Sequence, residues 1–303
     1  MQDTTCNKES SMEFRSPAWG RVRCLFECPI MNEHKWAKVP SIPADAFILD
    51  LEDAAPAPLK EQARARVVEY LGRPEYFGGR LAVPRANGLD TPWGRDDLIA
   101  LARAGVTTLM YPKIDTLDEV NEVISICEEN GASPELVASI ESMRGVLDAD
   151  AIFSHPSIVA TTFGPGDLHV DAGIPLYGPD GTLNHAFEWA KLETVFAAKS
   201  QGVAALSIAF APDLKDLVEI RRQIEGDHRL GFTGYCSFYP PQVPIINEVF
   251  TPSEEEIARA REIVRVYDEA IAAGNPAVQL PTGEAVLLHQ YKDANHLLAR
   301  VDA

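Results

Sequence analysis

The sequence contains no apolar run long enough to cross a lipid bilayer, and its first 16 residues lack the apolar segment of a secretory signal peptide. Its five cysteines are scattered and odd in number, unlike the paired cysteines of a disulfide framework. Cys24 and Cys28 lie four residues apart, but no second cysteine pair completes a zinc site. These absences predict a cytoplasmic protein with reduced, buried thiols and no membrane partner.

Basic residues are also few. The chain has 27 lysines and arginines against 45 aspartates and glutamates, a formal net charge of −18 at pH 7. Such a charge repels nucleic acids and anionic membranes and disfavours both as partners. A small anionic substrate would need a local basic pocket. The seven histidines show no ligand-like spacing. His169, two residues after Asp167, is interpreted as a loop histidine, with proton transfer as the alternative.

No Gly-x-Gly-x-x-Gly follows the first expected strand, which disfavours a dinucleotide-binding fold. Short apolar runs instead alternate with segments of helical periodicity. Strict alternation predicts a parallel sheet, and eight such units in 303 residues predict a (β/α)8 TIM barrel, an α/β fold, over 21–250. An open, doubly wound sheet is the alternative. The expected strands cover residues 22–28, 46–51, 81–83, 107–111, 136–140, 158–163, 204–208 and 229–232.

The two ends of the chain differ from the alternating region. Residues 1–20 are expected to form a flexible N-terminal tail. Beyond residue 250, Ser253 and Glu256 have the spacing of a helix capping box, and apolar residues then recur at helical spacing. Residues 251–303 are therefore predicted to form a C-terminal helical extension that packs on the barrel or on a neighbouring subunit.

Two apolar runs end in a carboxylate beside glycine. The run 137–145 contains Glu141, and the run 161–167 ends in Asp167. The two acids are 26 residues apart, about one strand–helix–strand repeat, so parallel strands would bring both to the same end of the sheet. Such a pair suits Mg²⁺, which takes one or two carboxylates and keeps its other positions for water and substrate. The alternative is that Glu141 caps a helix and Asp167 closes a glycine turn.

Further charged residues follow other expected strands, at the end where barrels of this type hold their active sites. Period-two alternation places Ile48, Asp50 and Glu52 on one face of their strand, with Asp53 directly after it. An ordinary ion pair explains any one of these residues equally well, but their convergence on one rim predicts an active site. A Schiff-base role for Lys113 is disfavoured, because the sequence shows no apolar pocket around it. The basic residues at the strand ends are Arg85, Lys113 and Arg144.

Together these motifs resemble the citrate lyase beta-subunit-like branch of the HpcH/HpaI aldolase superfamily. The resemblance extends from about residue 20 to residue 300, in the family's order and with similar gaps. Each motif is weak alone, and the set is specific. The motifs are Ile48-Leu-Asp-Leu-Glu-Asp-Ala54 with Lys60 and Arg64, Arg85-Ala-Asn87, Tyr111-Pro-Lys113, Ile140-Glu-Ser-Met-Arg-Gly145, Phe163-Gly-Pro-Gly-Asp167, Gly231-Phe-Thr-Gly234 and Asn247-Glu-Val-Phe-Thr-Pro-Ser253.

The resemblance implies a Mg²⁺-dependent TIM barrel, with Mn²⁺ as the alternative metal, that makes or breaks a carbon–carbon bond beside a carbonyl. Its substrates would be β-hydroxyacyl-CoA thioesters of the malyl, citramalyl or citryl type. These would be cleaved to an acyl-CoA and an oxo acid through a metal-stabilised enolate. The resemblance also implies a homo-oligomer, with a trimer favoured, in which the C-terminal segment reaches a neighbour's site.

Carried over residue by residue, the resemblance makes Glu141 and Asp167 the metal ligands. Arg85 would bind the oxo-acid carboxylate or the thioester carbonyl through its forked guanidinium. Glu52 would hold a metal-bound water or Arg85, and Asp53 is expected as a further catalytic residue. Retro-aldol cleavage places negative charge on oxygen, which Mg²⁺ and Arg85 would stabilise. The other expected substrate-binding residues are Arg23, Lys113, Arg144 and Gly166.

The chain departs from the family pattern at its substrate-facing end. The family's strand-seven aspartate is missing from Ser207-Ile-Ala209-Phe210. The lysine after Gly-Phe-Thr-Gly is Tyr235, and the following Ile-His-Pro is Phe238-Tyr239-Pro240. The family's C-terminal aspartate, an acid/base on the adjoining subunit, is Leu287, and Glu284 is out of register.

Three functions follow as hypotheses. The first is a Mg²⁺-dependent lyase of a β-hydroxyacyl-CoA thioester. The second is an aldolase of the same mechanism on a free small acid without CoA, favoured by Tyr235, Tyr239 and Leu287. The third is a catalytically inactive barrel that acts as a binding component. Glu141, Asp167 and Arg85 argue against the third hypothesis, because an inactive site has no physical need for two adjacent acids.

Overall fold

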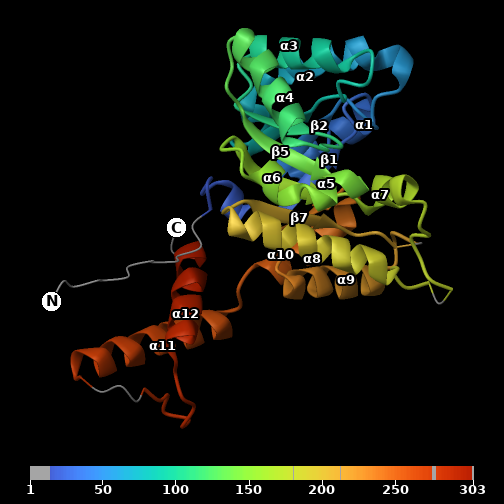
Figure 1. Cartoon of the computed structure of the whole chain (residues 1–303). Coiled ribbons are helices and arrows are strands. Elements are labelled where there is room, and N and C mark those ends of the chain that lie inside the picture. Colours follow the sequence, from blue (N-terminus) through green and yellow to red (C-terminus); the bar gives the residue numbers. More distant parts are fainter. Residues whose placement is uncertain (1–13, 180, 212, 275–277, 302–303) are drawn as a thin grey trace. The chain divides into compact units, whose positions relative to one another are not determined.

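Eight parallel strands form a closed barrel in the computed structural model, which describes residues 14–179, 181–211, 213–274 and 278–301. The strands follow one another in sequence order, and the last pairs with the first. Helices flank the strands on the outside (Figure 1). Connections through helices bring successive strands together in parallel, and the predicted (β/α)8 barrel is confirmed. The strands are β1 Cys24–Cys28, β2 Ala46–Asp50, β3 Leu81–Arg85, β4 Thr108–Tyr111, β5 Glu135–Ile140, β6 Ile158–Phe163, β7 Ala204–Ile208 and β8 Gly234–Ser237.

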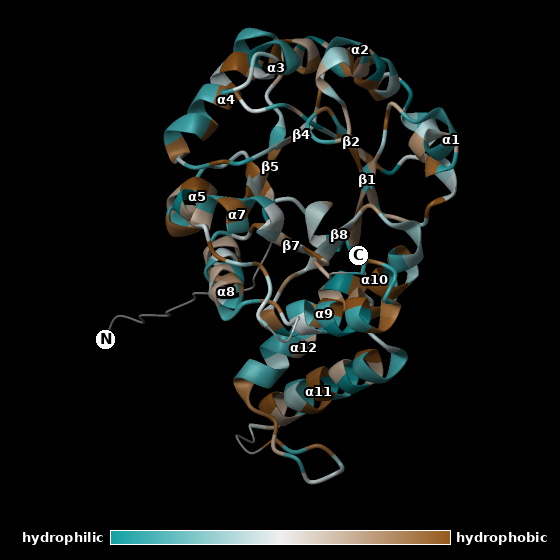
Figure 2. Ribbon diagram, turned by 90° about the vertical axis from the view of Figure 1, so that its right-hand side faces the viewer, coloured by the Kyte–Doolittle hydropathy of each residue, from teal (hydrophilic) through white to brown (hydrophobic). Residues whose placement is uncertain are grey.

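Helices surround the barrel (Figure 2). Side chains cap several of them: Thr116 accepts a hydrogen bond from the Glu119 backbone N–H, and Asp216 accepts two at the start of its helix. The α-helices of the barrel unit are α1 Glu33–Trp36, α2 Lys60–Leu71, α3 Gly94–Arg103, α4 Leu117–Glu129, α5 Met143–Leu147, α6 Ala149–Phe153, α7 Pro165–Ala172, α8 His185–Ser200, α9 Leu217–Leu230 and α10 Val243–Phe250. Short 3-10 helices are η1 Trp19–Arg21, η2 Val39–Ser41, η3 Ala57–Leu59, η4 Pro74–Phe77 and η5 Pro240–Gln242.

Alternation along each strand divides the buried apolar side chains between two layers. On β2, Ala46 and Ile48 belong to the cluster inside the barrel, whereas Phe47 and Leu49 pack outward with the helices. The predicted alternation continues to Asp50, which lies on the inner face opposite Arg85 of β3. The barrel interior is therefore apolar at its lower levels and polar at the carboxyl ends of the strands.

The expectation of a loose tail is wrong for residues 14–20. Trp19 is 1% exposed and packs with Val22 in the cluster inside the barrel. Arg15 donates hydrogen bonds to the carbonyls of His155 and Ile158. A large aromatic side chain just before the first strand closes the amino end of the barrel, and this burial outweighs the polar composition around it. Residues 1–13 lie outside the described part of the chain.

The last strand was misplaced by the sequence analysis. Residues 229 and 230, expected in a strand, are the last residues of helix α9, and β8 begins only at Gly234. Gly231, with φ of 106°, ends the helix in the left-handed region that glycine adopts readily. Phe232 is buried among the helices. A short apolar run beside a glycine was therefore a helix terminus and turn rather than a strand.

Helix α7 was also missed. The Gly-Pro-Gly sequence after β6 was considered as a glycine turn closed by Asp167, but a helix begins at Pro165. Proline suits the first turn of a helix, where its missing N–H has no intrahelical partner to lose. Asp167 therefore lies in the first turn of α7 rather than in a loop.

The described residues after Phe250, 251–274 and 278–301, belong to a compact unit separate from Phe14–Phe250. Helix α11 (Glu254–Ala272) begins with the predicted capping box between Ser253 and Glu256, which is confirmed. It pairs with helix α12 (Leu288–Val301) through a small apolar cluster. Tyr267 and Tyr291 stack there with ring centroids 4.3 Å apart. Among the described residues, no helix is both long and apolar enough to cross a membrane.

Candidate active site

A buried arginine is the centre of the polar layer. Arg85 ends β3, is 6% exposed, and donates a hydrogen bond from Nε to Oδ1 of Asp50 at 2.6 Å. Asp50 also accepts backbone hydrogen bonds from Glu52 at 2.9 Å and from Ala54 at 2.6 Å. Burial alone would raise the pKa of Asp50, but the charge and hydrogen bond of Arg85 and the two backbone bonds lower it on balance. Asp50 therefore fixes both the guanidinium and the loop after β2.

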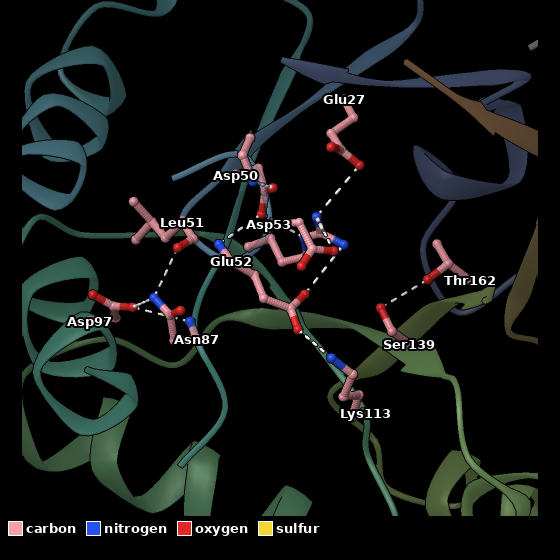
Figure 3. Close-up of polar contacts among 12 residues, drawn as sticks. Glu27, Asp50, Leu51, Glu52, Asp53, Asn87, Asp97, Lys113, Ser139 and Thr162 are labelled. Carbon is pink, nitrogen blue, oxygen red and sulfur yellow. Dashed lines mark hydrogen bonds and ion pairs between the residues drawn. The ribbon is translucent and has the colours of Figure 1, made fainter. Parts of the chain in front are cut away.

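Three further carboxylates face the terminal nitrogens of Arg85 (Figure 3). Glu52 Oε2 lies 3.4 Å from Nη1, Glu27 Oε2 lies 3.5 Å from Nη2, and Asp53 Oδ2 lies 3.7 Å from Nη2. These separations exceed a direct N–H···O hydrogen bond. Nη2 is buried and has no hydrogen-bond partner. Arg85 is thus held by Nε and keeps donor capacity for a substrate oxygen.

A second set of polar contacts supports the loop from behind. Lys60 of α2 donates from Nζ to the carbonyls of Leu51 and Glu52 at 2.6 and 2.5 Å, and to Oδ1 of Asn87 at 2.6 Å. Asn87 in turn donates to Asp97 of α3 at 2.5 Å (Figure 3). These motif residues therefore position the loop that carries Glu52 rather than facing a substrate themselves.

Lys113 links Glu52, one of the carboxylates around Arg85, to Asp167, one of the two predicted metal ligands. It follows β4 with φ of 49°, a left-handed conformation that costs a non-glycine residue of order 1 kcal/mol. Its Nζ donates to Glu52 Oε1 at 2.9 Å and lies 3.4 Å from Asp167 Oδ1. Burial lowers the pKa of Lys113, but the Glu52 hydrogen bond and the charges of Glu52 and Asp167 raise it on balance. The protonated amine is the wrong form for a Schiff base.

Glu141 is a buried acid without a hydrogen-bond partner for one of its oxygens. It follows β5, is 8% exposed, and its Oε2 is unsatisfied. Burial raises its pKa to about 8, and the charges of Glu52 and Asp167 add to this, while Arg85 and Lys113 oppose it. Ser142, not Glu141, caps helix α5, so the alternative capping role is wrong. An ionised carboxylate in this position needs a cation.

The acids fit a hard divalent cation. Glu141 follows β5 and Asp167 lies in the first turn of α7, directly after β6, so neighbouring strands deliver both. In the part of the chain that the structure describes, no three His, Cys, Asp or Glu residues are arranged to hold a metal. Two carboxylates, one with an unsatisfied buried oxygen, are the donor set that Mg²⁺ uses when it keeps water and substrate in its other positions.

Replacing Gly164 by alanine tests this geometry. A Cβ at Gly164 would lie 2.6 Å from Cγ and Oε1 of Glu141, closer than real contacts allow. The backbone of Gly164, with φ of −108°, accepts alanine, so the closest conflict is with the Glu141 side chain. We expect G164A to fold and to lose most of the thermal stabilisation by Mg²⁺, measured by calorimetry with and without EDTA.

Gly226 of α9 provides the matched control for this substitution. A Cβ there meets nothing within 4 Å, so G226A should keep its response to Mg²⁺ and gain up to about 1 kcal/mol from helix propensity. An unchanged response to Mg²⁺ in G164A as well would contradict the role assigned to Glu141.

Two predicted substrate-binding residues lie away from this group. Arg23 precedes β1 and pairs with Asp45, 2.9 Å away, at the amino ends of the strands. Its assignment to the substrate is wrong, because the site lies at the opposite end of β1. Arg144 pairs with Asp148 at 2.5 Å on α5, and its side chain is 63% exposed. A substrate contact for Arg144 stays a prediction.

Gly166 and His169 lie on α7 beside Asp167. A Cβ at Gly166 would lie 2.9 Å from the ring of Phe210, so packing explains this glycine. Its substrate role stays a prediction. The ring of His169 contacts the carbonyl of Gly166, so this histidine belongs to the helix and not to a loop.

At two departures from the family pattern, Tyr235 of β8 and Ser207 of β7, the side chains bind Asp227 in the helix layer. Tyr235 is fully buried and faces the helix layer, where its hydroxyl donates to Asp227 at 3.0 Å. Ser207 donates to the same carboxylate at 2.6 Å, and Lys191 of α8 binds both of its oxygens at 2.8 Å. The interpretation that Tyr235 alters the substrate end is therefore wrong. The side chain was assigned to the substrate end because sequence does not show to which side of β8 it points.

A pocket that includes Glu27, the ion-pair neighbour of Arg85, was not foreseen. It has a volume of about 660 Å³ and contains Glu27, which the sequence analysis did not single out. An isolated acid in the apolar run 24–28 was the available signal. Tyr239, at a family-altered position, lines this pocket together with Glu27. The lining residues are Phe26, Glu27, Pro29, Lys35, Lys38, Val39, Ser41, Ile42, Pro43, Phe238, Tyr239 and Pro240.

Known proteins share this sequence and fold. A model of the HpcH/HpaI aldolase/citrate lyase family matches residues 24–240. A (3S)-malyl-CoA thioesterase of Cereibacter sphaeroides is 31% identical over 281 residues, which cover 93% of this chain and 95% of that protein. An L-malyl-CoA/beta-methylmalyl-CoA lyase of the same species is 31% identical over 278 residues, covering 84% and 87%.

Among solved structures, a citrate lyase beta subunit from Mycobacterium tuberculosis, complexed with oxaloacetate and magnesium, is 25% identical with a TM-score of 0.68. The match covers 78% of this chain and all of that one. A closed parallel barrel with its polar groups at the strand carboxyl ends is a TIM-barrel enzyme. The chain belongs to the HpcH/HpaI aldolase/citrate lyase family, and it is a carbon–carbon lyase of the CoA-ester lyase type.

Proposed function

We propose that this protein is a Mg²⁺-dependent lyase that cleaves a β-hydroxyacyl-CoA thioester into an acyl-CoA and an oxo acid. The observation that carries the proposal is the buried, unsatisfied oxygen of Glu141 beside Asp167 and next to the Arg85 group. Glu141 and Asp167 are the proposed metal ligands, and Mn²⁺ is the alternative ion. The magnesium and oxaloacetate bound by the Mycobacterium tuberculosis relative support both the metal and an oxo-acid product.

The pocket supports a CoA thioester as the substrate. Lys35 and Lys38 supply positive charge that phosphate groups need on a protein of net charge −18. The pocket volume of about 660 Å³ suits a small molecule, and Glu27 connects it to Arg85. The malyl-CoA activities named for both Cereibacter sphaeroides relatives agree with this substrate class.

Arg85 would stabilise the charge that develops when the carbon–carbon bond breaks. Its Nη2 has no hydrogen-bond partner and would donate to the thioester carbonyl oxygen, which becomes an enolate oxygen. Asp50 holds the guanidinium in place before the substrate arrives, so no reorganisation is needed. Glu52 and Lys113 would orient the oxo-acid portion between Arg85 and Asp167. When bound, Mg²⁺ supplies Lewis-acid stabilisation of negative charge on substrate oxygen.

We further propose that the protein is a homo-oligomer, with a trimer favoured. The C-terminal unit exposes Ile271, Leu287 and Leu288, each more than half exposed, and these side chains would pack on a barrel, its own or a neighbour's. Sedimentation equilibrium measures the oligomeric state directly, and a monomer at micromolar concentration would contradict this proposal.

The test is an NMR-followed incubation of the purified protein with hydroxyacyl-CoA thioesters and the matching free acids, with Mg²⁺ and separately with EDTA. Thioester cleavage that EDTA abolishes is the expected result. Cleavage of free acids alone would support an aldolase that does not use CoA, which is favoured only by Tyr239 and Leu287 now that Tyr235 faces away. If no compound of the panel is cleaved, the result would support an inactive barrel and overturn the proposal.

A further inference from the structure

We infer that Glu27 is the proton-transfer residue of this enzyme, carrying a proton between the substrate hydroxyl oxygen and the α-carbon of the acyl product. This inference rests on the proposed function and goes beyond it, because nothing in the family resemblance assigns a role to this strand-one acid.

The strand places Glu27 at the mouth of the barrel. On β1, Leu25 packs inside the barrel, whereas Phe26 and Cys28 pack outward with the helices. Alternation therefore points Glu27 inward, one level above Leu25. Its side chain is 25% exposed, lies 3.5 Å from Arg85 and lines the pocket, so a ligand in that pocket reaches it.

Glu27 and Nη2 of Arg85 lie close enough together to contact the same bound substrate. Glu27 Oε2 lies 3.5 Å from Arg85 Nη2, too far for a good hydrogen bond (Figure 3). Asp53 Oδ2 lies farther away, at 3.7 Å, and Nη2 makes no hydrogen bond. Arg85 is itself 6% exposed and fixed by Asp50, so this unpaired donor is held in place. A carbonyl oxygen bound by Nη2 would have its α-carbon beside the Glu27 carboxylate.

The surrounding charges suit a proton carrier. Burial raises the pKa of Glu27 to about 7, Arg85 opposes this, and the charges of Asp50, Asp53 and Glu52 add to it. Both protonation states are therefore populated near neutral pH, which is the condition for efficient general acid–base catalysis. Several charged and titratable groups face Glu27. They are Asp50 of β2, Glu52 and Asp53 of the loop after β2, Arg85 of β3, Cys236 of β8, and Lys35 and Lys38 of the pocket.

Neighbouring acids are less suited to this task. Asp50 is committed to Arg85 and two backbone N–H groups. The Asp53 side chain is 68% exposed and open to water. Glu27 combines burial, access from the pocket and proximity to the unpaired Arg85 nitrogen.

The step balances with this single residue. The Glu27 carboxylate takes the proton of the substrate β-hydroxyl as the C–O bond becomes a carbonyl and the carbon–carbon bond breaks. The electron pair of that bond moves to the thioester carbonyl oxygen beside Arg85. The enolate then re-forms its carbonyl, and the α-carbon takes the proton back from Glu27. The oxo acid and the acyl-CoA leave with no net change in protons or electrons.

The test replaces Glu27 with glutamine in the full chain. With a thioester that the wild type cleaves, E27Q should lower kcat about 10²- to 10³-fold with little change in KM. It should also abolish exchange of the α-protons of acetyl-CoA for deuterium in D₂O, followed by NMR. Glu27→Asp should retain part of both activities. Thermal stabilisation of E27Q by Mg²⁺ should persist and would show an intact fold and metal site. Glu61→Gln on exposed α2 is the control for removing one negative charge.

The outcomes separate the two proposals. Suppose that the wild type cleaves a thioester, and that E27Q cleaves it and exchanges the α-protons at rates within threefold of the wild-type rates. That result would overturn the role of Glu27 and leave the lyase assignment standing. An unchanged dependence of kcat on pH in E27Q would do the same. A wild-type protein that cleaves no thioester would overturn the proposed function, and the inference with it.

Discussion

Replacing Glu141 by glutamine should abolish turnover and make the metal-free protein more stable. The substitution keeps the shape of the side chain and removes the charge that we assign to the metal, so we expect kcat to fall by about 10³-fold or more. Stabilisation by saturating Mg²⁺, about 2.7 kcal/mol at a hundredfold excess over Kd, should disappear. Single-turnover kinetics and calorimetry measure the two effects separately.

The gain in stability follows from the raised pKa of Glu141. Burial lifts that pKa to about 8 in the folded protein, well above its value in the unfolded chain. The protonated form is favoured by the fold, so its contribution is present below the unfolded pKa and is lost as the pH rises through about 8. Glutamine carries no such charge. We therefore expect E141Q in EDTA to exceed the wild type by about 1–3 kcal/mol at pH 8 and by less near pH 5.

Urea denaturation between pH 5 and 9 in EDTA tests this difference. The wild type should lose stability with rising pH, and E141Q should have a flatter profile. Glu61→Gln, on the exposed face of α2, should follow the wild type. Retention of Mg²⁺ stabilisation by E141Q would show that the metal is held elsewhere.

Replacing Arg85 by methionine should have the largest effect on folding. The guanidinium is 6% exposed and faces four carboxylates, of which Asp50 is fully buried. Removing one partner of a buried ion pair leaves an uncompensated charge, which costs about 3–5 kcal/mol. Turnover should vanish as well, because Arg85 is the proposed donor to the substrate oxygen. Urea denaturation at pH 7 measures the loss of stability.

A double-mutant cycle with Asp50→Asn separates the charge effect from lost packing. The double variant removes the unpaired carboxylate, so it should recover about 1–3 kcal/mol relative to R85M. Additive losses would mean that Arg85 contributes mainly through its aliphatic portion. Arg85→Lys should fold better than R85M but remain inactive, because an ammonium cannot reproduce the forked contacts of Nε and both Nη atoms.

Local patterns were sufficient for the architecture and for much of the polar rim. Alternation of strands and helices predicted a closed parallel barrel, since each helix returns the chain to the same edge of the sheet. Period-two alternation put Asp50 and Glu52 on the inner face, and both lie there with Arg85. Seven of the eight strands were found at or near their predicted positions, and the eighth was missed because a glycine-terminated helix ends in a similar apolar run.

The (β/α)8 barrel and the acids and bases after its strands could be predicted from local sequence, because these features depend on neighbours along the chain. Which of these charges meet depends on the folded barrel. It placed Glu27 against Arg85, bound Asp50 to the same guanidinium, left Arg23 at the opposite end, and turned Tyr235 outward to Asp227. Barrel closure joins β1 to β8 and sets the register of every strand, and contacts between residues so distant in sequence exist only once the barrel has closed.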